Sequence, residues 1–466
     1  MNNVTARSLN DWLTYDETSI ARLVATNGKQ DFTLTMMRHQ VMSLCRQLMS
    51  CGESRWALCF EDSYLFTVAL LAALHAGKTP VIYGHCRESV LREQHDEFDG
   101  LLTDNRLTLA CRCLYLSAEA PQGDGQHIDG QHIDGQHIKD ALPPIPDDAC
   151  LILFTSGSTG KPRQIHKPIR SMDEEARWLA RLWSERLRDC HVMASVSHQH
   201  MYGLTFRIWL PMSLGLSFDS RQVLYSEQLA AHSPTRRYAF ISSPAFLRRI
   251  DHSLQAPLCE LIVSAGGVLP WPCAQSAQQW LGSAVDEIYG STETGVMGWR
   301  SRQDEQTVWQ PFPGVSFQGD DDGSWRARSA LIPQPEGMKL DDKLAFDERG
   351  CFQLCGRHDR IVKIEDKRIS LSEIERRLLS LPEIDDAVAL QVTRQDRSGI
   401  GVVLVLKSPA VTAGLPALKR QWRHELHKWL EPVAMPRFWR IVDAIPLNSQ
   451  SKRAWPQIQE LFHATG

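Results

Sequence analysis

The sequence has no long hydrophobic run. Its most apolar stretch, Leu65–Ala76, is too short to cross the hydrocarbon core of a bilayer. The first residues, Met1–Trp12, lack the basic start and apolar core of a signal peptide. We therefore expect a cytoplasmic protein without a membrane span.

The sequence also lacks a recognisable zinc site. The 12 cysteines include the close pairs Cys111/Cys113 and Cys351/Cys355, and neither pair is joined by a second pair at zinc-binding distance. The pattern H-E-x-x-H is absent, because His424–His427 is one residue too short. We interpret the cysteines as reduced thiols, several of them buried.

The overall composition is ordinary for a globular protein, but the charge is unevenly distributed. The 466 residues suffice for two or more domains, and 43% are hydrophobic. From Arg357 to the end, 18 Lys and Arg oppose 13 Asp and Glu, although the whole chain carries a net charge of −4. A basic C-terminal part favours an acidic partner or an anionic substrate there. An imbalance of this size is also common without function, and both interpretations stay open.

The pattern of apolar runs predicts an α/β fold. Two short apolar runs, Trp56–Phe60 and Thr79–Tyr83, flank the helical stretch Tyr64–His75, which is the order strand, helix, strand of a parallel sheet. The same alternation returns later in the chain at Ala239–Ile241, Pro244–Ile250 and Glu260–Val263. We expect a large N-terminal lobe of sheets built from such units.

A second, smaller α+β domain is predicted at the C-terminus. Turn-rich sequence precedes residue 356, so we place the boundary between domains 1–356 and 357–466. The expected elements that follow are strands at Ile361–Ile364, Ala387–Val392 and Gly401–Leu406 and helices at Leu371–Ser380 and Leu418–Leu430.

Residues 121–140 contain a tandem repeat. The pentapeptide Gly125–Asp129 recurs as Gly130–Asp134, and a third copy ends in Lys139. We interpret the segment as a tolerated surface insertion. Weak metal binding by its histidines and aspartates is the alternative.

A phosphate-binding loop follows the apolar strand Cys150–Phe154. Glycines let backbone N–H groups converge on an anion, hydroxyls add donors, and a lysine adds charge. A Walker A loop is excluded because Thr155 stands where its first glycine belongs and Pro162 follows the lysine. The loop residues are Thr155, Ser156, Gly157, Ser158, Thr159, Gly160 and Lys161.

Further motifs follow in a characteristic order, and together they resemble one family. With the phosphate loop they are similar to the adenylate-forming (AMP-binding) superfamily, which comprises acyl-CoA synthetases, aryl and fatty acid ligases, luciferases and the adenylation domains of peptide synthetases. The resemblance covers roughly residues 30–460. The segments that carry it are His198–Leu204, Ser264–Pro270, Tyr289–Glu293, Gly356–Lys363, Lys367–Glu375 and Pro446–Lys452.

The resemblance implies a nucleotide site in the large lobe. Thr292 would contact the α-phosphate of ATP, and Glu293 would hold Mg²⁺, which takes few carboxylates and keeps its phosphate ligands. Gly266 would lie against the adenine, as would Tyr289 and Gly290. These assignments come from the matching motif positions.

The carboxylate substrate is assigned from the segment His198–Leu204. The resemblance matches His200 to a histidine that lines the carboxylate pocket. Peptide-synthetase domains have an Asp in this region for the substrate's amino group, and no Asp occurs in the segment. An amino acid is therefore disfavoured, and an aryl or aliphatic acid is expected.

Residues from the end of the large lobe and from the small domain would complete the site. The resemblance implies that Asp342, or Asp341 in its place, binds the ribose hydroxyls and that Arg357 contacts the nucleotide. Asp359 would be the hinge of lobe rotation. Lys452 would bridge the substrate carboxylate and the α-phosphate. The negative charge on these oxygens moves during the reaction, and a compact positive charge on a flexible side chain can follow it.

Three departures from the family pattern occur, and the one at Glu365-Asp366 bears on the second half-reaction. Gln164 and Ser451 stand where the family has glycine, and Glu365-Asp366 replaces small residues beside the expected pantetheine tunnel. Adenylation is therefore better supported than thioester formation.

The predicted reaction is the adenylation of a carboxylic acid by ATP and Mg²⁺, with release of pyrophosphate. The acyl group would then pass to a phosphopantetheine thiol of an acyl carrier protein. The alternatives are a CoA ligase and a degenerate, non-catalytic adenylate-binding protein. No nucleic-acid partner is expected.

Overall fold

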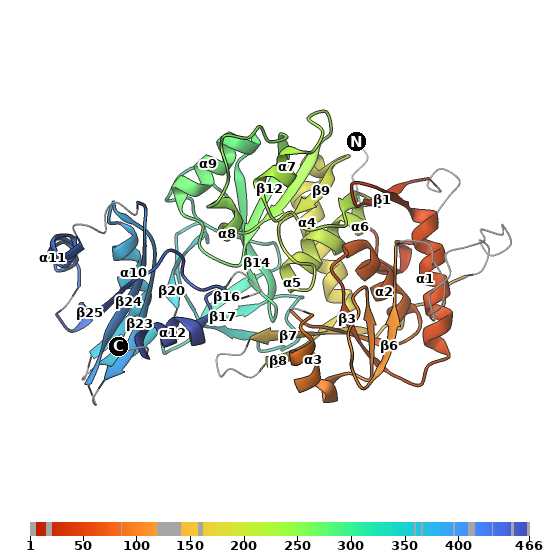
Figure 1. Ribbon diagram of the computed structural model, residues 1–466, viewed down its shortest axis with the longest axis horizontal. Coiled ribbons are helices and arrows are strands. Elements are labelled where there is room, and N and C mark those ends of the chain that lie inside the picture. Colours follow the sequence, from red (N-terminus) through yellow and green to blue (C-terminus); the bar gives the residue numbers. More distant parts are fainter. Residues whose placement is uncertain are drawn as a thin grey trace. The chain divides into compact units, whose positions relative to one another are not determined.

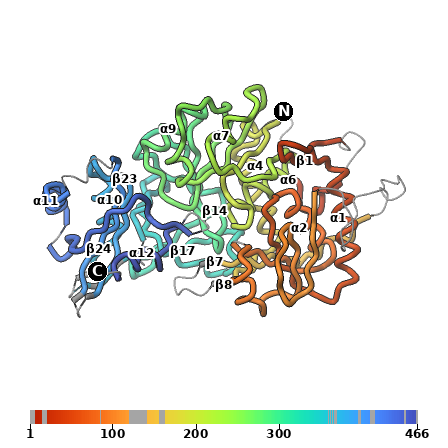
Figure 2. The backbone as a smooth tube through the Cα atoms, viewed as in Figure 1, coloured from red at the N-terminus to blue at the C-terminus, as the bar shows by residue number. Residues whose placement is uncertain are grey.

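The computed structural model describes eleven stretches of the chain, which form two compact units. The described residues are 6–14, 21–84, 86–118, 141–156, 162–357, 360–364, 367–394, 397–408, 415–430, 432–448 and 452–463. The first unit comprises Met1–Val315 and Arg328–Pro335, and the second comprises Ser316–Ala327 and Glu336–Gly466. Figure 2 traces the backbone from one end to the other. The repeat at 121–140 lies outside the described residues.

A nine-stranded sheet is the larger of the two sheets in the first unit. Its strands are β1 (Leu23–Thr26), β2 (Asp31–Thr33), β9 (His191–Ala194), β10 (Ser217–Asp219), β11 (Tyr238–Ser242), β12 (Cys259–Ala265), β13 (Val285–Ser291), β14 (Gly295–Ser301) and β15 (Gln310–Pro311). They are ordered β15-β14-β13-β12-β11-β9-β10-β1-β2. The stretch from β10 through β13 is parallel throughout.

A six-stranded sheet contains the predicted strand–helix–strand unit. Its strands are β3 (Arg55–Cys59), β4 (Thr79–Ile82), β5 (Gly100–Thr103), β6 (Arg112–Tyr115), β7 (Cys150–Ser156) and β8 (Pro162–Pro168). They are ordered β6-β5-β3-β4-β7-β8. Strands β3 and β4 are parallel neighbours joined by α2 (Ser63–His75), so this prediction is confirmed.

Helix α2 is buried between the two sheets (Figure 1). Every one of its residues is buried, which explains why its sequence is apolar on all sides. Asp62 caps the helix by accepting the N–H groups of Tyr64 and Leu65 at 2.9 and 3.0 Å. The other carboxylate oxygen of Asp62 accepts a hydrogen bond of 2.6 Å from the hydroxyl of Ser220, which lies just beyond β10. The cap therefore ties the helix to the nine-stranded sheet.

The remaining helices of the first unit lie around these sheets (Figure 1). Two are long: α1 (Leu34–Met49) packs on α2, and α4 (Ile169–Leu187) follows β8 and contacts β12. The others are α3 (Glu88–Glu93), α5 (Met201–Gly203), the π-helix η4 (Leu204–Trp209), α6 (Leu210–Leu214), α7 (Ser226–Ala230), α8 (Pro244–Leu247), α9 (Trp271–Leu281) and the 3₁₀ turns η1 (Leu9–Asp11) and η2 (His95–Glu97).

The second unit is the predicted α+β structure. Its strands are β16 (Ser316–Gly319), β17 (Trp325–Arg328), β18 (Met338–Leu340), β19 (Asp342–Phe346), β20 (Phe352–Arg357), β21 (Ile361–Ile364), β22 (Lys367–Ser370), β23 (Ile384–Arg394), β24 (Arg397–Leu406) and β25 (Pro436–Ile441). Its helices are α10 (Leu371–Leu379), α11 (Leu415–Leu426), α12 (Trp455–His463) and the 3₁₀ turn η6 (Pro432–Ala434). Helix α11 ends four residues before the predicted Leu430, because the chain continues in hydrogen-bonded turns.

Strands β16, β18 and β19 and most of β17 and β20 belong to the second unit, although they precede the boundary that we place at residues 356/357. That boundary separates the parts that the resemblance implies rotate relative to each other, and it stays a prediction. The hinge residue Asp359 lies outside the described residues.

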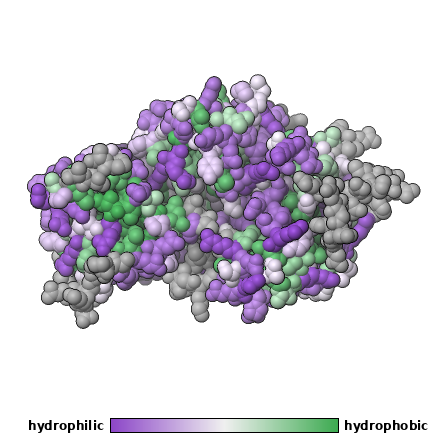
Figure 3. All heavy atoms as spheres, in the orientation of Figure 1, coloured by the Kyte–Doolittle hydropathy of each residue, from purple (hydrophilic) through white to green (hydrophobic). Residues whose placement is uncertain are grey.

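The visible surface is mostly hydrophilic (Figure 3). Hydrophobic side chains gather in the second unit, over α10 and β24. Within the described ranges, no helix combines the length and the hydrophobicity needed to cross a bilayer.

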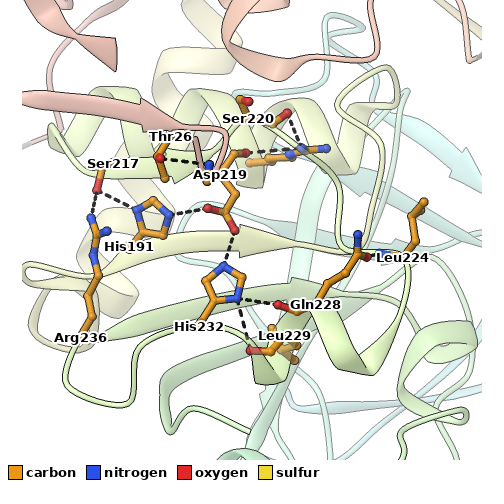
Figure 4. Close-up of polar contacts among 12 residues, drawn as sticks. Thr26, His191, Ser217, Asp219, Ser220, Leu224, Gln228, Leu229, His232 and Arg236 are labelled. Atoms are coloured by element: carbon orange, nitrogen blue, oxygen red, sulfur yellow. Dashed lines mark hydrogen bonds and ion pairs between the residues drawn. The ribbon is translucent and has the colours of Figure 1, made fainter. Parts of the chain in front are cut away.

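A partly buried cluster of two histidines and an aspartate fixes the start of β9 (Figure 4). The carboxylate oxygens of Asp219 lie 2.8 Å from Nε2 of His191 and 2.8 Å from Nε2 of His232. Nδ1 of His191 lies 2.9 Å from the hydroxyl of Ser217, which accepts a hydrogen bond from Arg236. The cluster links β9 and β10 to the chain that follows α7.

The hydrogen bonds give the two imidazoles different charges. His191 donates to Asp219 and accepts from Ser217, so it is neutral, and burial lowers its pKa. His232 donates from both nitrogens, to Asp219 and to the carbonyl of Gln228, which requires the imidazolium form. Burial opposes that form, but the bond to Asp219 raises the pKa of His232. Burial by itself would raise the pKa of Asp219, but the hydrogen bonds and charges of the two imidazoles outweigh burial and lower this pKa to about 2.

Asp219→Asn is expected to reduce stability in a pH-dependent way. The ionised carboxylate of Asp219 contributes fully to the free energy of unfolding above the ordinary carboxyl pKa of about 4, and this contribution is lost as pH falls through about 2. The contribution of His232 is present below about pH 6.5 and is lost as pH rises through its raised pKa. The loss of unfolding free energy in the variant should therefore be largest near pH 5, roughly 2–3 kcal/mol from the carboxyl alone.

Urea unfolding of wild type and variant at pH 5, 7 and 9 measures this difference. Asp96→Asn is the control, since it breaks an exposed pair with His95 and should change stability little. A deficit for Asp219→Asn that is equal at pH 5 and pH 9 would contradict the assigned charges.

Candidate functional site

The predicted site segments follow strands that end together at one edge of the nine-stranded sheet. In the parallel ladders, Ala194 of β9 pairs with Ile241, Ser242 of β11 with Ser264, and Ala265 of β12 with Ile288. The chain leaves these strands as Ser195–His200, as Gly266-Gly267 and as Tyr289–Glu293. Carboxyl ends of parallel strands are the common place for ligand binding in open α/β sheets.

The motif Tyr289–Glu293 forms the tip of the hairpin β13–β14. Gly290 pairs with Val296 and Ser291 with Gly295. The hydroxyls of Ser291 and Thr294 close the turn with mutual bonds to each other's N–H groups, both at 3.1 Å. A Cβ on Gly290 would lie 2.2 Å from the carbonyl oxygen of Gly295, so only glycine allows this approach.

Thr292 and Glu293 lie half-buried at the tip of that hairpin. In the described part of the chain, no hydrogen bond or ion pair engages the side chain of Glu293, so its carboxylate is available to a cation. The described residues contain no group of three or more His, Cys, Asp or Glu side chains that could hold a metal ion. One free carboxylate suits Mg²⁺ bound mainly by substrate phosphates.

The residues assigned to adenine differ in exposure. Tyr289 is buried, with its ring 5.9 Å from that of Trp309 in an edge-on arrangement, whereas Gly290 is exposed. Gly266 has φ +83°, a left-handed conformation that favours glycine in the turn after β12. The roles of all three toward a nucleotide stay predictions.

The segment His198–Leu204 is held against the strand ends by Tyr202. Its hydroxyl lies 3.0 Å from the carbonyl oxygen of Ser242 and 3.1 Å from that of Val263. The tyrosine thereby joins this segment to the ends of β11 and β12. Burial raises the pKa of Tyr202, so the hydroxyl keeps its proton and donates.

The two histidines of this segment lie in different surroundings. His198 is buried, with Nδ1 2.9 Å from the hydroxyl of Ser63 and its ring against Phe66 at 4.5 Å. His200 is half-buried and precedes α5. His198 therefore serves packing against α2, which leaves His200 as the histidine for the predicted carboxylate pocket.

Gly203 allows α5 to approach the loop before it. A Cβ at this position would lie 1.9 Å from the carbonyl oxygen of Ser197. The backbone here is helical, so the glycine is required by contact and not by its dihedral angles. The close approach to the carbonyl oxygen of Ser197 therefore explains why the motif has glycine at this position.

The phosphate loop connects two paired strands. Strands β7 and β8 are antiparallel, and Thr155 pairs with Arg163 and Ser156 with Pro162. Residues 157–161, which include Gly157, Ser158, Thr159, Gly160 and Lys161, lie outside the described residues. Their assigned role stays a prediction.

Two buried charged residues that sequence reasoning missed lie beneath the hairpin tip. Nζ of Lys167, at the end of β8, donates to the carbonyl oxygen of Thr292 at 3.2 Å. Glu175, in α4, accepts the N–H of Val296 at 2.7 Å and the hydroxyl of Thr205 at 2.9 Å. No local sequence pattern marks this cluster, because its members come from distant parts of the chain.

The charges of this pair are held in low dielectric. Burial lowers the pKa of Lys167, and Glu175 and Glu293 oppose that shift. Burial likewise raises the pKa of Glu175, and Lys167 opposes it together with the two hydrogen bonds to Val296 and Thr205. Each group therefore favours the charged form of the other.

In the second unit, the residues assigned to the ribose and nucleotide lie side by side. Asp342 and Arg357 are partners in the ladder β19–β20, and the guanidinium of Arg357 lies 3.2 Å from the carboxylate of Asp341. Sequence reasoning proposed Asp342, with Asp341 as its alternative. Their roles toward a nucleotide stay predictions.

Lys452 is exposed in a short turn of the second unit. Its N–H donates to the side chain of Asn448 at 3.0 Å, and the N–H of Asn448 donates to its carbonyl at 2.7 Å. The next residue, Arg453, anchors the turn through Asp386 at 2.8 Å. The turn is thus fixed to β23 while the lysine side chain reaches the surface.

Comparison with known proteins identifies the family. A family model described as AMP-binding enzyme matches residues 15–322. A 4-coumarate–CoA ligase of Cereibacter sphaeroides is 26% identical over 254 residues, which are 53% of this chain and 58% of that protein. Another 4-coumarate–CoA ligase, from Halorhodospira halophila, is 28% identical over 319 residues, 65% of this chain and 74% of that protein.

The fold is shared with a solved structure. The crystal structure of ATP-bound MatB from Rhodopseudomonas palustris matches with a TM-score of 0.79 and 18% identity, over 98% of this chain and 99% of that one. The chain therefore belongs to the AMP-binding, adenylate-forming enzyme family, as its motifs predicted.

Proposed function

We propose that this protein adenylates an aryl or fatty acid and passes the acyl group to a phosphopantetheine thiol. The observation that carries the proposal is the hairpin Tyr289–Glu293 at the carboxyl edge of a parallel sheet, in a chain of the AMP-binding family. The phosphate-loop hairpin and the segment around His200 supply the remaining parts in the same unit.

The first half-reaction joins the acid to AMP. A carboxylate oxygen of the substrate attacks the α-phosphorus of ATP, and the bond to pyrophosphate breaks. Thr292 would donate to the α-phosphate, Glu293 would hold Mg²⁺, and Lys452 would neutralise the reacting oxygens. Fixed charges placed where charge develops lower the barrier.

The second half-reaction forms the thioester. The thiol sulfur attacks the acyl carbon, the bond to the AMP oxygen breaks, and the thiol proton is lost to solvent. Rotation of the small domain about Asp359 would exchange the adenylation arrangement for the thiol-binding one.

The acid class follows from the segment His198–Leu204. It offers no carboxylate to an amino group, which disfavours an amino acid. The names of the two relatives above, 4-coumarate–CoA ligases, favour an aryl acid.

For the acceptor we favour an acyl carrier protein. The chain from Arg357 onward is basic, and carrier proteins are acidic. Trp429 is 62% exposed, and the guanidinium of Arg377 lies 4.0 Å from its ring, so an aromatic contact stands beside positive charge. A relative named L-proline–[L-prolyl-carrier protein] ligase, from Streptomyces coelicolor, is 23% identical over 354 residues.

Free CoA is the second candidate acceptor, because the first relatives are named CoA ligases. The replacement of small residues by Glu365-Asp366, which lie outside the described residues, bears on either acceptor.

Pyrophosphate release without a thiol tests the first half-reaction. With ATP and Mg²⁺, one class among benzoates, cinnamates and short- to long-chain fatty acids should give clear release. Lys452→Ala should slow that release by roughly 10²–10³-fold, since one transition-state contact is lost. Lys428→Ala is the control, because Lys428 is an exposed lysine of the same unit that pairs only with Glu425 at the surface.

If none of these acids gave pyrophosphate release while the protein still bound ATP, the result would favour a degenerate, non-catalytic adenylate-binding protein. An unchanged rate for Lys452→Ala would refute the role of that lysine.

Transfer from the acyl-adenylate tests the acceptor. The phosphopantetheinylated carrier protein should accept the acyl group, and the same carrier without its phosphopantetheine should not. Trp429→Ala should raise the KM for the carrier protein several-fold and leave the KM for CoA unchanged, because only the protein reaches this surface. Rapid transfer to CoA with none to the carrier protein would replace the first candidate by the second.

A further inference from the structure

Lys167 and Glu175 are two of the most deeply buried charged side chains in the described part of the chain, at 2% and 1% exposure. Burying a charge in a protein interior costs several kcal/mol, and apolar side chains of similar size would often be more stabilising. Stability alone therefore does not explain the pair. Its contacts point to another purpose.

Lys167 connects the phosphate-loop hairpin to the turn that carries Thr292 and Glu293. It pairs with Leu151 in the ladder β7–β8, which is the base of the phosphate-loop hairpin. From there its ammonium reaches the carbonyl oxygen of Thr292 at 3.2 Å. A charged donor on a neutral acceptor gives a stronger hydrogen bond than a neutral donor.

Glu175 connects the same turn to the segment of His200. One carboxylate oxygen accepts the N–H of Val296 at 2.7 Å, where β14 leaves the turn. The other accepts the hydroxyl of Thr205 at 2.9 Å, in the π-helix that continues directly from His198–Gly203.

Gly295 makes this approach of Glu175 possible. It has φ +67°, and a Cβ there would lie 2.8 Å from the carboxylate oxygen of Glu175. The turn is therefore shaped so that its backbone lies directly on the buried carboxylate.

We propose that Lys167 and Glu175 are positioning residues, a buried junction that sets the base of the β7–β8 hairpin, the Thr292–Glu293 turn and the His200 segment in register with one another. The proposal rests on the proposed function for its catalytic consequence. Neither residue touches substrate: each holds backbone or hydroxyl groups of segments that do. Loss of the junction lets the turn shift relative to the phosphates, and misplacement by about 1 Å costs up to roughly 10²-fold in rate.

Lys167→Met tests the junction, because methionine has a similar length and no charge. We expect kcat for pyrophosphate release to fall roughly 10- to 100-fold, the Mg²⁺ concentration for half-maximal rate to rise several-fold, and the KM for the acid to change less than about twofold. Amide hydrogen exchange of residues 290–297, measured without ligands, should become at least about 10-fold faster.

A double variant separates positioning from charge balance. Lys167→Met alone leaves the buried carboxylate uncompensated, whereas Lys167→Met with Glu175→Gln leaves a neutral pair. The double variant should recover part of the thermal midpoint of the single one. Its Mg²⁺ requirement and its turn exchange should stay altered, because the bond to Thr292 is still missing.

Asp286→Asn is the matched control for general destabilisation. Asp286 is fully buried on β13, the same strand that leads into the turn, and is held by Trp183 at 2.6 Å and Arg186 at 2.7 Å. The variant should lower the thermal midpoint and leave the Mg²⁺ requirement and the exchange of residues 290–297 unchanged.

The inference would be overturned if Lys167→Met kept the wild-type Mg²⁺ dependence and the wild-type amide exchange of residues 290–297. It would also be overturned if Asp286→Asn changed these two quantities as much as Lys167→Met does. Absence of pyrophosphate release by the wild type would defeat the proposed function. The exchange comparison would still decide whether the junction holds the turn.

Discussion

The arrangement of the site depends on the parallel register of β9, β11, β12 and β13. Each of β9, β11 and β12 ends within about one residue of its parallel neighbour and β13 runs three residues farther, so the segments that follow them emerge at one edge of the sheet. Tyr202 binds the carbonyl oxygens of Ser242, at the end of β11, and of Val263, two residues before the end of β12. The hairpin β13–β14 extends beyond the other strands.

Buried side chains support the hairpin tip that carries two of the predicted site residues. Glu293 lies on a turn that within the described residues has no partner for its carboxylate, so it is available to a cation, while the backbone on either side is held from beneath by Lys167 and Glu175. Glycines appear where backbones approach each other, as at Gly203 and Gly290. The backbone around the half-buried Thr292 and Glu293 is thus held by two buried side chains.

Local sequence patterns predicted the elements and the motifs well. The unit β3–α2–β4 was readable because an apolar helix lay between two apolar strands. The segment Tyr289–Glu293 was recognised because it resembles a family motif of consecutive residues. These features depend on neighbouring residues, and the sequence displays neighbours directly.

Features that depend on distant residues were not readable. Lys167 meets Thr292 across 125 positions of the chain, and Glu175 stands in the acidic run Asp173–Glu175, which is typical of a solvated helix face.

The most direct test of the account follows one oxygen atom. If a carboxylate oxygen attacks the α-phosphorus, an acid labelled with ¹⁸O in both carboxylate oxygens must deliver one label to AMP once the acyl group has moved to a thiol. Mass spectrometry of the nucleotide product should therefore find AMP that carries a single ¹⁸O. Label in free phosphate, or ADP as the nucleotide product, would contradict acyl-adenylate formation.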